Sequence, residues 1–61
     1  MKFSINQIVK GKVCGYFVVL GYRTLLGNQF VQVKPFCLET QNVLPGEFAL
    51  EESCLEQINN D

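Results

Sequence analysis

Glycine or proline recurs every few residues along this chain of 61 residues, so no stretch before the C-terminal tail is long enough for a helix of average length. Glycine weakens a helix because its backbone loses more freedom on folding, and proline removes a backbone donor. Short strands joined by turns are the regular structure that remains. The interrupting residues are Gly11, Gly15, Gly21, Gly27, Pro35, Pro45 and Gly46.

Five segments between these residues are predicted to be strands. Residues 16–24 combine aromatic and β-branched side chains, which favour a half-buried pleated surface, and Gly21 permits the sharp coiling that small barrels need. Residues 25–28 form a connection that predicts a hairpin with the next strand. We expect that strand to end, or to lie on a sheet edge, at Pro35, because proline cannot donate to a ladder. The predicted strands are residues 7–13, 16–24, 29–34, 47–50 and 55–58, with one helical turn at residues 51–54.

This order of elements is typical of an SH3-like barrel. We therefore predict an all-β fold, a five-stranded antiparallel SH3-like barrel with a single helical turn before the last strand. A chain this short buries only about 60% of the surface that its unfolded form exposes, so residues 1–61 are expected to form one domain. The side chains predicted to form its core are Ile8, Val13, Phe17, Val19, Val31, Val33, Phe48, Leu50, Leu55 and Ile58.

The C-terminal part of the chain also supports this fold by resemblance. Residues 47–59, with a strand, a short turn and the pattern Leu-x-x-Ile, are similar to the end of SH3-like barrels, including the plasmid-borne type II dihydrofolate reductases. In that reductase family the equivalent strand carries Val-Gln-Ile-Tyr, which lines the pore of a tetramer. Here the four positions are Glu47, Phe48, Ala49 and Leu50. Because the glutamine and the tyrosine are missing, the resemblance concerns the fold and implies no reductase activity.

The residue types argue against catalysis, a cofactor or a metal. The chain has no histidine for an acid–base pair and no glycine-rich phosphate loop. Its cysteines, Cys14, Cys37 and Cys54, are too far apart for a Cys-x-x-Cys metal site. Lys10 and Lys12 could activate Cys14, but a small buried apolar side chain is the favoured interpretation. We predict a non-enzymatic protein without cofactor or metal; an enzyme built at an oligomer interface, which the reductase resemblance would suggest, is a third alternative with no residues to name.

Charge divides the chain into two halves. All five basic residues precede residue 35 and all six acidic residues follow it, although the net charge is only −1. One interpretation is a nucleic-acid-binding face, in which cations contact phosphates and a tyrosine stacks on a base. The other is mutual neutralisation, with the acidic last strand beside the basic first strand. The residues of the nucleic-acid alternative are Lys10, Lys12, Arg23, Lys34 and Tyr16.

The predicted hairpin carries large apolar groups on both faces. If Phe17 and Val19 point inward, then Tyr16, Tyr22 and Phe30 should point outward together, where coiling of the strand either buries them or leaves an exposed patch. An exposed patch indicates binding of a protein partner or formation of a homodimer. We therefore predict an interaction module with a binding face made of Tyr16, Tyr22, Arg23, Phe30 and Lys34.

The cellular location is predicted from the apolar runs. Residues 1–7 lack the apolar stretch of a secretory signal, and the longest apolar run, residues 16–20, is far shorter than the ~20 residues that span a bilayer as a helix. We expect a cytoplasmic protein that does not enter the membrane.

Overall fold

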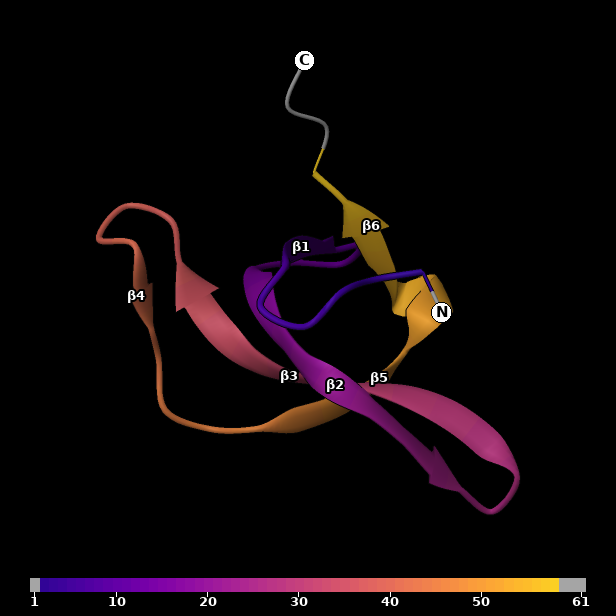
Figure 1. The fold of residues 1–61 in the computed structure, drawn as a ribbon. Coiled ribbons are helices and arrows are strands. Elements are labelled where there is room, and N and C mark those ends of the chain that lie inside the picture. The colour runs from indigo at the N-terminus through magenta and orange to yellow at the C-terminus, as the bar shows by residue number, and fades with distance from the viewer. Residues whose placement is uncertain (1, 59–61) are drawn as a thin grey trace.

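One antiparallel sheet carries the regular structure of the computed structural model, which describes residues 2–58 (Figure 1). The elements are β1 (Ile8–Gly11), β2 (Tyr16–Leu25), β3 (Asn28–Cys37), β4 (Asn42–Val43), β5 (Phe48–Glu51), the 3-10 turn η1 (Glu52–Cys54) and β6 (Leu55–Gln57). The all-β prediction is confirmed, and so is the helical turn before the last strand. The described residues form six strands rather than five, because the short β4 was not predicted.

The strands lie in the order β6-β1-β2-β3, and both β4 and β5 pair with the far edge of β3. The turn η1 joins β5 to β6, although these strands lie at opposite ends of the order. Within residues 2–58 no strand pairing joins β5 to β6, so hydrogen bonds do not close the sheet. No helix in this part of the chain has the length and the apolar composition that crossing a membrane requires.

The long hairpin β2–β3 turns on two residues. Leu25 pairs with Asn28, and between them Leu26 and Gly27 have φ angles of 50° and 80°. Two consecutive positive φ angles are typical of the type I′ turn, whose twist matches that of the flanking strands. The predicted hairpin is therefore present, with a tighter connection than the four residues expected.

A bulge in β2 reverses which face its side chains occupy. Val19 pairs with Val33, whereas Gly21 pairs with Gln32 and Tyr22 with Val31, so Leu20 is an extra residue in β2. An extra residue shifts the alternation by one. Tyr22 consequently lies on the same face as Val19 and Val31, and the expectation that it shares a face with Tyr16 is wrong.

Pro35 does not end its strand. β3 continues to Cys37, and Pro35 pairs with Phe17. The carbonyl of Pro35 accepts the Leu44 N–H at 2.8 Å, on the side away from β2. In an extended residue the backbone nitrogen and the carbonyl point to the same side of the strand. The nitrogen of Pro35 therefore faces the segment between β4 and β5, which pairs with neither end of β3 in a ladder. The missing N–H of proline thus costs no hydrogen bond between strands.

The core lies on one face of the curled sheet. Of the predicted core residues, Val19, Val31, Val33 and Leu55 are confirmed as buried, and Phe17 and Leu50 pack against them. The remaining members, Phe3 and Val9, were not predicted. Phe3 comes from the N-terminal segment, which lies beside η1 (Figure 1).

Four predicted core residues lie elsewhere. Val13 is 96% exposed, because β1 ends at Gly11 and Val13 lies in the bend that follows. Phe48 remains 49% exposed at the start of β5. Ile8 and Ile58 are half-buried, and both face a groove outside the core.

Candidate functional site

The outer face of the sheet, opposite the core, carries two rows of paired side chains. One row is Ile8, Val18 and Lys34, and the next is Lys10, Tyr16 and Phe36. Residues directly opposite one another on neighbouring strands share a face, so both rows lie together. The rows are largely apolar, and this is the second apolar face that the hairpin sequence indicated.

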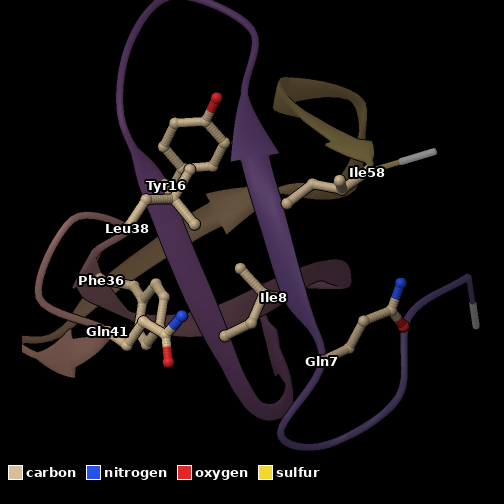
Figure 2. A pocket seen from close by; sticks show the side chains of 7 residues that line it. All are labelled: Gln7, Ile8, Tyr16, Phe36, Leu38, Gln41 and Ile58. Atoms are coloured by element: carbon tan, nitrogen blue, oxygen red, sulfur yellow. The ribbon is translucent and has the colours of Figure 1, made fainter. Parts of the chain in front are cut away.

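A groove of about 510 Å³ lies over these rows. Ile8 and Tyr16 project from the neighbouring strands β1 and β2, and Ile58 lies on the far side of the groove from Leu38 (Figure 2). Val18, in the same row as Ile8, is only 7% exposed, so the sheet beneath the groove is well packed. The full lining is Gln7, Ile8, Tyr16, Phe36, Leu38, Gln41 and Ile58.

The polar groups of the groove are two carboxamides and one phenol. The side chain of Gln7 is held in place, because its Oε1 accepts the Ser4 N–H at 2.9 Å, and its main-chain carbonyl accepts the Val19 N–H at 2.9 Å. The carboxamide NH₂ of Gln7 is thus the part available as a donor. Among residues 2–58, the groups that line the groove include no carboxylate, thiol or amine.

The predicted binding residues separate into three places. Tyr16 lines the groove, and Lys34 lies beside it on the outer face, two residues before Phe36. Arg23 and Phe30 pair with each other beyond the bulge, and Phe30 also pairs with Glu51 of β5. The structure therefore brings Tyr16 and Lys34 together near the groove but leaves Arg23 and Phe30 near the hairpin tip.

Tyr22, the fifth predicted residue, holds the N-terminal segment in place. Its hydroxyl accepts the Phe3 N–H at 2.9 Å and the Lys2 N–H at 3.0 Å, and it donates to Glu52. Burial and the neighbouring Glu52 raise the pKa of Tyr22, and the bond from Tyr22 lowers the pKa of Glu52. These contacts fix Phe3 in the core, so we assign Tyr22 a structural role.

The basic residues of the nucleic-acid alternative do not all lie together. Lys10 pairs with Tyr16 on one side and lies opposite Glu56 of β6 on the other. This register places the basic first strand beside the acidic last strand, as the neutralisation hypothesis expected. Lys12 lies in the bend after β1, and Arg23 lies near the hairpin tip.

The cysteines are free thiols. Cys14 is exposed, so the expectation of a buried apolar side chain is wrong; it lies in an open bend and not in a strand. Hydrogen bonds from the hydroxyl and the N–H of Thr40, and from the N–H of Glu39, lower the pKa of Cys37. Among the described residues, no three cysteine, aspartate or glutamate side chains are grouped closely enough to hold a metal ion.

Sequence reasoning missed most of the apolar groove. The sequence pattern predicts Ile8 and Ile58 in the core and gives no role to Phe36 and Leu38. The sequence feature that could have revealed the groove is that Phe30, Lys34 and Phe36 are separated by even numbers of residues. They therefore share a face along β3. Continuing that alternation past Pro35 would have placed Phe36 beside Tyr16.

Comparisons with models of protein families, with curated proteins and with solved structures found no match to this chain.

Proposed function

We propose that this chain is an SH3-like barrel that acts as a non-enzymatic interaction module and binds a protein partner, or a second copy of itself, through the groove on its outer face. The strand order β6-β1-β2-β3-β5, with η1 between β5 and β6, supports the barrel assignment. The bulge in β2 supports it too, because such bulges let a strand bend from one half of a barrel into the other.

One observation carries the functional proposal: the groove is lined by five apolar side chains and remains open to solvent. Leu38 is 45% exposed, and Ile8, Tyr16, Phe36 and Ile58 are half-buried. A concave apolar surface with a few fixed polar groups is typical of a binding site. Burial against a partner would also add to the small core of a 61-residue chain.

The test is a selection of random peptides against the purified protein, together with sedimentation over a wide concentration range. We expect either bound peptides or a concentration-dependent dimer. Either one should be weakened about fivefold by Leu38→Ser, since a loss of about 1 kcal/mol of binding free energy lowers affinity about fivefold. Leu26→Ser is the matched control, because Leu26 is fully exposed at the hairpin tip, away from the groove. A monomer that selects no peptide, or binding that both variants weaken equally, would contradict the proposal.

The alternative is a nucleic-acid-binding protein, and one observation favours it. Tyr16 pairs with Lys10 and shares the outer face with Lys34, so a ring and two cations lie on one surface. Binding of this kind weakens steeply as salt is raised, with a slope set by the number of phosphates contacted. Titration with a short oligothymidylate at several salt concentrations distinguishes it from apolar binding, which changes little.

A further inference from the structure

Lys34 has a different electrostatic setting from Lys10, the other cation in the two outer rows. Lys10 lies opposite the carboxylate-bearing Glu56, whereas Lys34 lies opposite Val18. β5 pairs with β3 only as far as Val33, and β4 begins to pair at Phe36. Position 34 therefore lies outside both ladders on that side, where Glu47, the residue just before β5, is the next position along the β3–β5 register. On its other side Lys34 pairs with the apolar Val18.

Lys34 is not one of the lining residues of the groove, but it lies on β3 two residues before Phe36, which is one. It shares a face with Phe36, and the row of Val18 and Ile8 runs from it across the sheet. Its side chain is half-buried, so its methylene groups cover apolar surface while the ammonium group reaches toward water. An apolar ligand seated in the groove would bring its neighbouring atoms next to this ammonium group.

We propose that the groove binds a short peptide segment in which apolar side chains flank a carboxylate, with the carboxylate paired to Lys34. This inference rests on the proposed function and names the chemistry of the partner. The apolar lining would take the flanking side chains. The carboxamides of Gln7 and Gln41 carry groups that complement the amides of a peptide backbone.

The lining favours an acidic peptide over a second copy of the chain and over nucleic acid. In an isologous dimer the same surface meets itself, and the part of the groove lining that residues 2–58 provide contains no carboxylate to offer to Lys34. Nucleic acid could stack on Tyr16 and Phe36, but the other three apolar side chains of the lining, Ile8, Leu38 and Ile58, are aliphatic and suit the side chains of a peptide better than bases. The net charge of −1 also gives no general attraction for phosphates.

The experiment is a titration of the ¹⁵N-labelled protein, followed by NMR, with a matched panel of blocked heptapeptides. Each peptide has leucine, isoleucine or phenylalanine on both sides of a central aspartate, asparagine or lysine. We expect shifts at groove residues and affinity about two- to fivefold higher for aspartate than for asparagine, as expected for an exposed ion pair. The preference should shrink at high salt.

Substitutions at the two lysines separate the role of Lys34 from general charge. Lys34→Gln should abolish the aspartate preference while leaving the asparagine peptide bound, and Lys34→Arg should restore the preference. Lys10→Gln, the matched control, should retain most of it, because Lys10 already faces Glu56.

The outcomes distinguish the two proposals. Equal binding of the aspartate and asparagine peptides, or a preference that survives Lys34→Gln, overturns the inference and leaves the proposed function standing. The same holds if only a second copy occupies the groove. Binding of oligothymidylate in place of every peptide overturns the inference and favours the nucleic-acid alternative over the proposed function. If no peptide binds, and Leu38→Ser changes neither binding nor sedimentation, both proposals fall.

Discussion

The two faces of the β2–β3 hairpin are similarly apolar in sequence but differ in how the rest of the chain covers them. Val19, Val31 and Val33 on the core face are completely buried in a cluster with Phe3, Val9 and Leu55. On the outer face only Val18 is buried, while Tyr16 and Phe36 remain half-exposed beside the groove. The difference shows that apolar content alone does not define a core; the segments that fold back over a face do.

The largest expected change in the free energy of unfolding comes from a substitution on the core face, and it tests whether that face alone stabilises the fold. Leu55 is completely buried, so Leu55→Ala should destabilise the protein by about 2–5 kcal/mol. That is on the order of the whole stability of so small a domain. Leu38→Ala, on the groove, should cost less than about 0.5 kcal/mol. Urea unfolding followed by circular dichroism measures both, and equal losses would mean that the outer face is a second core.

A smaller effect is expected from removing one tyrosine hydroxyl on each face. Tyr22→Phe leaves the Phe3 N–H group without its partner, while the Lys2 N–H and Glu52 keep only the hydrogen bond between them, so we expect a loss of about 1–2 kcal/mol. Tyr16→Phe on the outer face should change the free energy of unfolding by less than about 0.5 kcal/mol. Urea unfolding measures both changes. A larger loss of stability for Tyr16→Phe than for Tyr22→Phe would mean that the outer face contributes more than the core face.

The pH dependence of stability should come from the hydrogen bonds that join Tyr22, Glu52 and the N-terminal segment. The pKa of Glu52 is lowered in the folded protein, so its contribution is present above the unfolded pKa of about 4.3 and is lost as the pH falls through the folded value. Glu52→Gln should therefore lower the urea midpoint at neutral pH, with the difference from the parent protein shrinking in acid. A constant difference at every pH would contradict this assignment.

The same hydrogen bonds predict a smaller change in stability at alkaline pH. The pKa of Tyr22 is raised in the folded protein, so its contribution is complete below the unfolded pKa of about 10 and is lost as the pH rises through the folded value. An absorbance titration of tyrosinate should show a late-ionising tyrosine that Tyr22→Phe removes. If Tyr16→Phe removes it instead, the assignment of the late titration to Tyr22 is wrong.

Sequence patterns were enough to predict the all-β class, the positions of five strands to within a few residues, the hairpin and the helical turn before the last strand. Those features depend on local preferences: β-branched and aromatic runs, and glycines where a turn needs positive φ, as at Gly27.

Which side chains face the core and which face the groove depends on how the strands pair in three dimensions. The bulge at Leu20 turned Tyr22 inward, and the shorter β1 exposed Val13. β3 continued through Pro35 because its nitrogen met no ladder partner, and that brought Phe36 beside Tyr16. The physical reason is that strand register depends on pairing between distant segments, and a shift of one residue exchanges the two faces of a strand.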